Sequence, residues 1–272
     1  MSKRAVVLAG GQGSRLRPYT VVLPKPLMPI GEFSILEIIL RQLAANGFDR
    51  ITLAVNYQAE IVRAFCGDGS RWGISIDYSL ETVPLSTIGP LCLIGDLPEN
   101  FLLMNGDVLT DLSMNKLYEE HVSQGRQFTI AASERTNIVD YGVLHANENQ
   151  LVGFEEKPKF QYLVSMGIYV MNRALLKRVP KGQKYGFDNL ILDMLARKEP
   201  VHVERHPGYW LDIGRVDDYM RAVDEFDERR KQLLPDEKWN PGNRGDRISR
   251  PLPGRGAGIG RPLGAPAFER RR

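Results

Sequence analysis

Cysteine is scarce in this chain, which has only Cys66 and Cys92 among 272 residues. Their spacing fits no zinc or iron–sulfur site, and two thiols are too few for the disulfide framework of a small secreted domain. Long apolar runs are missing too, because no stretch approaches the roughly 20 apolar residues that a transmembrane helix needs. The first four residues lead into a strand-like run without the pattern of a cleavable signal. We therefore expect a cytoplasmic protein with no membrane span.

Several catalytic and nucleotide-binding signatures are also absent. The four histidines have no metal-ligand spacing, and no Ser-His-Asp or Cys-His arrangement is recognisable. The glycine cluster at 10–13 is not a Walker A loop, because no Lys follows a glycine at the required spacing. It is not a dinucleotide fingerprint either, because Leu16 stands where the third glycine is needed.

The net charge of +3 is unevenly distributed along the chain. Residues 236–272 hold eight Arg and one Lys against two Asp and two Glu, so this tail carries +5 and the preceding residues carry −2. The tail is rich in Pro and Gly and poor in large apolar residues, so it cannot offset the entropy lost on folding. We predict one folded domain over 1–235 and a disordered tail over 236–272. Such a tail can touch nucleic acid or an anionic membrane, but a solvated extension is favoured, and we expect no nucleic-acid partner.

Strand-like apolar runs alternate with helical patterns through the domain. Ser34 is placed to cap a helix that ends near Gly47, and the run 51–55 is then a strand. A second helix through 61–65 precedes an alternating strand at 74–78. This order predicts an α/β fold in which a mixed, mostly parallel sheet has helices on both faces.

The most informative segment is residues 8–18, LAGGQGSRLRP. It follows the apolar run 5–8, and its glycines let backbone amides approach an anion without interference from a Cβ atom. Arg15, Arg17 and Lys25 add positive charge, the guanidinium groups suiting forked phosphate contacts and the ammonium acting as a point charge. A tight turn with solvated arginines is the plainer alternative. One ligand with several phosphates would satisfy all of these groups.

Two acids stand in similar settings farther along the chain. Asp107 follows the apolar run 101–105 through a glycine, and Asp212 lies in the segment 208–214, GYWLDIG. Ligands of open α/β sheets gather beyond the carboxyl ends of the strands, and Mg²⁺ prefers carboxylate oxygens. Asp107 alone is better explained as a turn residue after a glycine. Together the two acids are candidates to share one ion.

The stretch Gly10-Gly11-Gln12-Gly13-Ser14-Arg15-Leu16-Arg17-Pro18, with Pro24-Lys25-Pro26 after it, resembles the signature of the sugar-1-phosphate nucleotidylyltransferases. That signature is Gly-Gly-x-Gly-Thr-Arg-Leu-x-Pro followed by Pro-Lys-Pro, and the chain has Ser14 where the family usually has Thr. The resemblance implies a Rossmann-like (GT-A-like) fold and transfer of a nucleoside monophosphate to a sugar 1-phosphate, with release of pyrophosphate. It implies that the nucleoside triphosphate is bound by Leu8, Gly10, Gly11, Gly13, Ser14 and Arg15.

The resemblance extends to the two acids. The family places one Mg²⁺ ligand after a Gly-Asp strand end and another in a Trp-x-Asp-x-Gly stretch, and these positions are Asp107 and Asp212 here. By resemblance the cofactor is Mg²⁺, and the catalytic residues are Arg15, Lys25 and Asp107.

The acceptor side is suggested by two further segments. Residues 152–158, VGFEEKP, resemble the family's Glu-Lys-Pro segment, in which the acid contacts sugar hydroxyls and the Lys meets the sugar phosphate. From composition alone, a charged strand end facing water is the better interpretation. Ser165 stands where many relatives have Asn, which leaves the sugar open. The resemblance assigns sugar-phosphate binding to Asn105, Gly142, Glu156, Lys157 and Gly167.

Base selection rests on residues 81–89, ETVPLSTIG, which resemble the family's Glu-x-x-Pro-Leu-Gly-Thr-Ala-Gly segment with Ser86 and Ile88 as departures. We assign Glu81 and Ser86 to the nucleotide site. A carboxylate only accepts hydrogen bonds, so Glu81 suits guanine, which presents a ring N–H beside an amino group. GTP is therefore favoured, with dTTP, UTP or CTP as alternatives. An alternative function is that of a non-catalytic subunit that binds a nucleotide sugar and regulates a partner. Assembly into a homo-oligomer is also compatible with the sequence.

Overall fold

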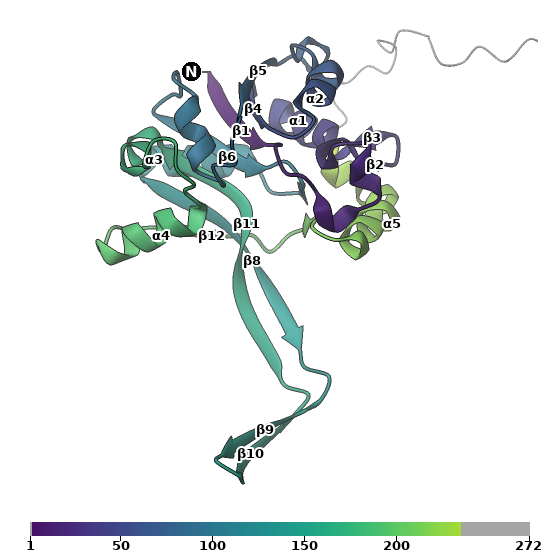
Figure 1. The fold of residues 1–272 in the computed structure, drawn as a ribbon, viewed down its shortest axis with the longest axis vertical. Helices are drawn as coiled ribbons and strands as arrows, with labels where there is room; N and C mark the ends of the chain where they lie inside the picture. Colours follow the sequence, from purple (N-terminus) through teal and green to yellow (C-terminus); the bar gives the residue numbers. More distant parts are fainter. Residues whose placement is uncertain (1, 235–272) are drawn as a thin grey trace, which may run out of the picture. The chain divides into compact units, whose positions relative to one another are not determined.

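The computed structural model of this chain describes residues 2–234, and the predicted tail at 236–272 lies outside the described residues. Its centre is a seven-stranded sheet with the order β12-β8-β11-β6-β1-β4-β5 (Figure 1). These strands are β1 (Lys3–Leu8), β4 (Phe48–Val55), β5 (Ser75–Leu80), β6 (Asn100–Asn105), β8 (Phe128–Ile138), β11 (Lys159–Asn172) and β12 (His202–Arg205). Four of the six neighbouring pairs are parallel, because β11 alone runs against the others. The predicted mixed, mostly parallel sheet is confirmed.

Helices cover both faces of the sheet, as predicted. They are α1 (Ile35–Ala45), α2 (Ala59–Cys66), α3 (Met114–Ser123), α4 (Phe187–Ala196) and α5 (Val216–Leu233). Adjacent residues of β1 point to opposite faces, so Val7 packs in the core with α1, α2, α3 and α5, whereas Val6 packs in a second core with α4. None of these helices within residues 2–234 is long and apolar enough to cross a membrane.

Local signals place the first β-α-β unit where the sequence predicts it. Helix α1 begins after Ser34, whose Oγ accepts a hydrogen bond from the Glu37 backbone N–H at 3.1 Å. The predicted strand at 51–55 lies within β4, the helix through 61–65 within α2, and the strand at 74–78 overlaps β5.

The carboxyl ends of four strands meet at one edge of the sheet. The Ala9 N–H donates to the carbonyl of Ala54 at 2.8 Å, and the Glu81 N–H donates to that of Val55 at 2.9 Å. The Gly106 N–H donates to the carbonyl of Leu8 at 2.9 Å. The chain therefore brings the glycine loop, the segment after β5 and the acid after β6 to the same edge.

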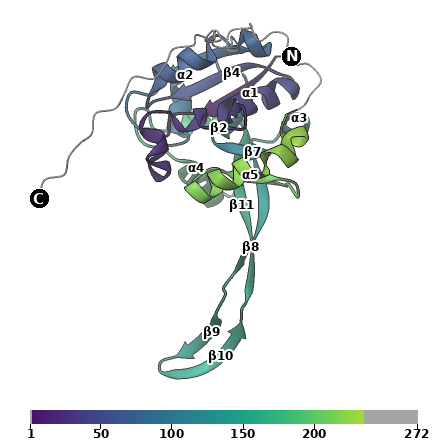
Figure 2. The ribbon, with the colours of Figure 1, turned by 90° about the vertical axis from the view of Figure 1, so that its right-hand side faces the viewer.

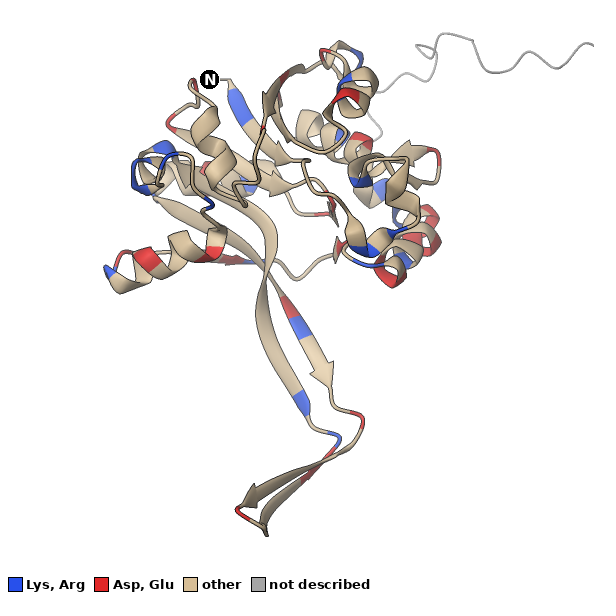
Figure 3. Cartoon of the chain, in the orientation of Figure 1, with Lys and Arg blue, Asp and Glu red and all other residues tan. Residues whose placement is uncertain are grey.

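Among the described residues, three pairs of short strands lie outside the main sheet. These are β2 (Pro29–Ile30) with β3 (Phe33–Ser34), β7 (Val108–Thr110) with β13 (Trp210–Asp212), and β9 (Gly142–Asn147) with β10 (Gln150–Glu156). Strands β8 and β11 stay paired beyond the sheet and lead into the β9–β10 hairpin, which extends away from the sheet in both views (Figures 1 and 2). Most of this ribbon carries no charge (Figure 3). Its exposed apolar side chains include Tyr141, Leu144, Leu151, Val152 and Phe154.

Candidate active site

The centre of the candidate site is an ion pair between the Lys25 ammonium and the Asp107 carboxylate. Lys25 opens a short 3₁₀ turn after the glycine loop, and Asp107 follows β6. The residue before Asp107 has to be a glycine, because a Cβ atom on Gly106 would lie 2.8 Å from the Leu8 carbonyl oxygen of β1. The side chains of Lys25 and Asp107 are 12% and 24% exposed, so a ligand can still reach both.

The second acid is aligned with the first by backbone pairing. In the β7–β13 ladder Asp212 stands opposite Val108, and the Ile213 N–H donates to the Asp107 carbonyl at 3.0 Å. The Asp212 side chain is exposed to solvent on one side, and surrounding protein atoms exclude water from its other side. This desolvation, with the neighbouring negative charge of Asp107, raises the pKa of the Asp212 carboxyl. A cation between the two carboxylates would relieve that repulsion.

Arg15 supplies a positive group beside these acids. It lies in the 3₁₀ turn Ser14–Leu16, and a Cβ atom on Gly214 would lie 3.9 Å from Arg15 Nη1, 3.6 Å from an Asp212 oxygen and 3.9 Å from an Asp218 oxygen. The guanidinium makes no hydrogen bond or ion pair with any of residues 2–234. It is therefore available for an anionic ligand. Sequence patterns did not point to Asp218, although its place in the first turn of α5 right after the Asp212 segment is a usable signal.

The residues present fit a magnesium ion bound together with phosphate. No group of three or more His, Cys, Asp or Glu side chains within residues 2–234 is arranged to hold a metal. Mg²⁺ does not need one, since it is commonly held by one or two carboxylates, substrate phosphates and water. Asp107 and Asp212 are the two acids that could hold it.

The predicted nucleotide residues lie at the end of β1, in the glycine loop and in the segment after β5. Glu81 lies directly after β5, and its carboxylate accepts hydrogen bonds from the Leu85 backbone N–H and, at 3.4 Å, from the Asn56 amide. Ser86 has a φ of 72°, which L-residues rarely adopt, at the position where the family has glycine. Its backbone thus keeps the conformation that glycine would take, with an exposed side chain. Leu8 ends β1, and Gly10, Gly11 and Gly13 follow it in the loop.

The predicted sugar-phosphate residues are split between two places. Asn105 ends β6 beside Asp107, and Gly167 lies against it, since a Cβ atom there would be 2.6 Å from the Asn105 amide nitrogen. Gly142, Glu156 and Lys157 instead belong to the projecting ribbon, where Lys157 forms an ion pair of 2.8 Å with Asp140. The structure therefore brings the first two to the cluster of Arg15, Lys25, Asp107 and Asp212 and leaves the other three away from it (Figures 1 and 2).

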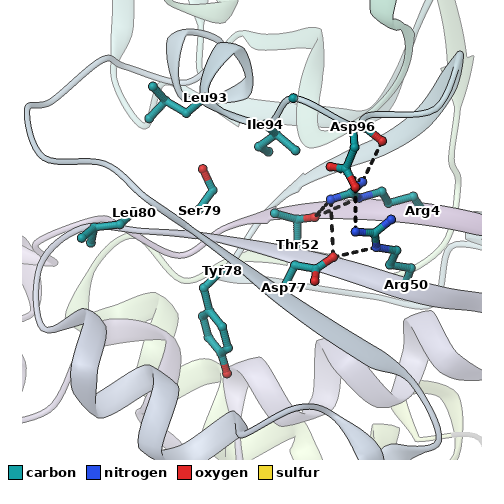
Figure 4. Close-up of a pocket in the computed structure, with 11 residues that line it drawn as sticks. Arg4, Arg50, Thr52, Asp77, Tyr78, Ser79, Leu80, Leu93, Ile94 and Asp96 are labelled. Carbon is teal, nitrogen blue, oxygen red and sulfur yellow. Dashed lines mark hydrogen bonds and ion pairs between the residues drawn. The ribbon is translucent and has the colours of Figure 1, made fainter.

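A cleft of about 370 Å³ lies on the sheet face formed by β1, β4 and β5, but its charged groups satisfy one another (Figure 4). Arg4 pairs with Asp96 at 2.8 Å and with Asp77 at 3.5 Å, and it donates to Thr52 at 2.7 Å. Arg50 pairs with the same two acids. Two arginines and two aspartates leave no net charge for a phosphate. We interpret the ion pairs in this cleft as a structural clamp that holds the edge strand β5.

Comparison with known proteins shows the family and agrees with the fold. The model of the family described as "Nucleotidyl transferase" matches residues 4–229. The chain is 32% identical over 231 residues to a mannose-1-phosphate guanylyltransferase catalytic subunit beta of Drosophila pseudoobscura pseudoobscura, covering 81% of this chain and 61% of that protein. It thus spans about three fifths of that relative.

Two further relatives differ in the nucleotide that they are named for. A D-glycero-alpha-D-manno-heptose 1-phosphate guanylyltransferase of Aneurinibacillus thermoaerophilus is 30% identical over 225 residues, with 82% of this chain and 97% of that protein covered. A UTP–glucose-1-phosphate uridylyltransferase of Synechocystis is 30% identical over 241 residues, with 81% and 62% covered.

Among solved structures, HddC from Yersinia pseudotuberculosis superposes with a TM-score of 0.65 at 24% identity, covering 82% of this chain and 99% of that one. This likeness supports the fold. The family match over residues 4–229 includes every member of the charged cluster. The chain therefore belongs to the nucleotidyl transferase family.

Proposed function

We propose that this chain is a sugar-1-phosphate nucleotidylyltransferase that uses GTP. The observation that carries the proposal is the convergence of Arg15, Lys25, Asp107 and Asp212, from four separate segments, at the carboxyl ends of β1 and β6. A binding protein does not need two acids beside a basic phosphate loop. An enzyme that moves charge between phosphate groups does.

In the proposed reaction, a phosphate oxygen of the sugar 1-phosphate attacks the α-phosphorus of the nucleotide in line. The bond from that phosphorus to the bridging oxygen breaks, and pyrophosphate leaves with the electron pair. The glycine-loop amides and Arg15 hold the triphosphate, and Lys25 offsets negative charge as it shifts toward pyrophosphate. Asp107 and Asp212 would hold Mg²⁺, which would supply further charge neutralisation.

GTP is proposed because Glu81 offers only acceptor atoms at the predicted base site, and relatives named guanylyltransferases support this choice. The relative named for UTP keeps a second base in view. The sugar phosphate is left to experiment.

Contact between the sugar phosphate and the side chains of Glu156 and Lys157 requires the projecting ribbon to lie over the charged cluster when substrate is bound. Its exposed Tyr141, Leu144 and Phe154 favour packing against another surface, because an isolated two-stranded ribbon is only marginally stable in water. We propose that the ribbon completes the acceptor side in this way.

The test is pyrophosphate release with Mg²⁺, offering GTP, dTTP, UTP, CTP and ATP, each with mannose, glucose, glucosamine and heptose 1-phosphates. Release with GTP and one sugar supports the proposal, and release only with another nucleotide keeps the chemistry and overturns the base. Silence in all combinations, with tight binding of a nucleotide sugar in calorimetry, would instead favour the regulatory subunit.

A further inference from the structure

Asn56 lies between the glycine loop and Glu81, although no sequence motif marks it. It follows β4 directly, next to the ends of β1 and β5 in the sheet. A Cβ atom on Gly10 would lie 3.0 Å from the Asn56 Cβ, so the loop backbone passes against this side chain. On its other side, the Asn56 amide nitrogen is 3.4 Å from Glu81 Oε2. Asn56 thus lies between the glycine loop and the carboxylate of the predicted base site.

The neighbours of Asn56 determine which way its amide points. A carboxylate has no proton to donate, so the amide group facing Glu81 has to be the NH₂ and not the carbonyl oxygen. The NH₂ has a second N–H that is not used by Glu81. The other oxygen of Glu81 accepts a hydrogen bond from the Leu85 backbone N–H, and this bond holds the carboxylate in place. Each carboxylate oxygen still has a free lone pair, because it carries two.

We propose that Asn56 and Glu81 together recognise the Watson–Crick edge of guanine, an inference that rests on the proposed function. Asn56 donates to O6, and the two Glu81 oxygens accept from the ring N–H and the exocyclic amino group. The protein presents donor, acceptor, acceptor, and guanine presents acceptor, donor, donor. Asn56 is thereby a specificity-determining residue.

The same edge disfavours the other bases. Uracil and thymine have one ring N–H between two carbonyl oxygens, so one carbonyl would face a Glu81 oxygen. Cytosine and adenine present a ring nitrogen acceptor where guanine has its ring N–H. In each case an acceptor meets a carboxylate, an arrangement that leaves partly buried polar groups unpaired.

The experiment compares GTP with 2,6-diaminopurine riboside triphosphate, which replaces O6 with an amino group, lacks the ring N–H and keeps the 2-amino group. The loss of the ring N–H is the same for every protein variant, so a change in the ratio between variants reports on the contact to position 6. With one sugar 1-phosphate at saturation, the kcat/KM ratio of GTP to the analogue is measured for the wild type, Asn56→Leu and Asn56→Ser. We expect both variants to lower this ratio by about 10-fold or more, since they remove the O6 donor. Gln124→Glu, a change at the exposed end of α3, should leave the ratio unchanged.

Because the ratio is measured within one preparation, it does not depend on how much of a variant is folded. If a variant does not turn over, the same ratio is taken from dissociation constants in calorimetry. An unchanged ratio in both variants of a GTP-using enzyme overturns the role of Asn56. A wild type that uses only a pyrimidine nucleotide also overturns it, although nucleotidyl transfer stands. A wild type that releases no pyrophosphate with any nucleotide overturns the proposed function itself.

Discussion

The ammonium of Lys25 is paired with the carboxylate of Asp107, although 82 positions of the chain separate them. This pair places a cation on the acid that is the candidate magnesium ligand. A Mg²⁺ ion held by Asp107 would compete with the ammonium for that carboxylate, so the ammonium could then meet phosphate oxygens. The pair thus links the metal site to the phosphate site.

Replacing Lys25 tests its role in charge stabilisation. We expect Lys25→Met to lower kcat by one to three orders of magnitude, because a positive group near the breaking phosphate bond is lost. Pyrophosphate release under saturating substrates measures the effect. Lys116→Met, at a side chain that is 73% exposed on α3, should have no effect. An unchanged kcat in Lys25→Met would remove Lys25 from the catalytic residues.

Replacing Asp107 tests the metal assignment. We expect Asp107→Asn to abolish Mg²⁺-dependent turnover and to weaken Mn²⁺ binding, measured by electron paramagnetic resonance, with little change in melting temperature. Adding Asp212→Asn should weaken Mn²⁺ binding little further, because ligands of one ion act as a unit. Asp224→Asn, at an exposed position of α5, is the matched control. Undiminished Mn²⁺ binding in the double variant would contradict the assignment.

Lys157 tests whether the ribbon reaches the acceptor site. We expect Lys157→Ala to raise the KM for the sugar 1-phosphate about 10-fold or more while leaving the KM for GTP nearly unchanged, because it would remove a charge contact to one substrate. Lys159→Ala, two residues farther along the same ribbon, is the control. Equal effects of the two changes would argue that only the charge of the ribbon matters.

The clamp around Arg4 should matter for stability and not for turnover. Arg4 is 4% exposed, and its loss would leave Asp77 and Asp96 with Arg50 as their remaining partner. These acids are 40% and 57% exposed and can rehydrate, so we expect Arg4→Leu to cost about 2 kcal/mol in the free energy of unfolding. Arg50→Leu, at a side chain that is 41% exposed, should cost less than about 1 kcal/mol. Urea unfolding measures both, and a large fall in kcat for Arg4→Leu would show that the cleft serves the reaction.

Stability should fall in mild acid because of His121. This side chain is fully buried, with Nδ1 2.9 Å from Thr129 Oγ1, and burial lowers its pKa to about 4. Above pH 6.5, the ordinary value, the ring is neutral in both the folded and the unfolded chain. As the pH falls from 6.5 toward 4, only the unfolded chain takes up the proton, so up to about 3 kcal/mol of stability is lost.

The measurement is the free energy of unfolding from pH 7.5 to 4.5. In His121→Gln the pH dependence over this window should be weaker than in the wild type, whereas His145→Gln, at an exposed ring, should keep the wild-type profile. Identical profiles for all three proteins would assign the acid sensitivity to other groups.

Local signals in the sequence determined much of this protein. The Ser34 cap, the glycines after β1 and the acid after β6 were all readable, because capping, turn conformation and apolar periodicity act over a few residues. The family followed from the same short segments.

Only the tertiary structure decided which of these residues meet. The pairing of Lys25 with Asp107, the alignment of Asp212 beside it and the position of Asn56 against Glu81 depend on the order and register of strands that lie far apart in the chain. The split of the acceptor residues between β6 and the ribbon likewise depends on where β8 and β11 leave the sheet. Strand register is set by the packing of whole sheet faces and not by residues near each strand, so local patterns cannot specify it.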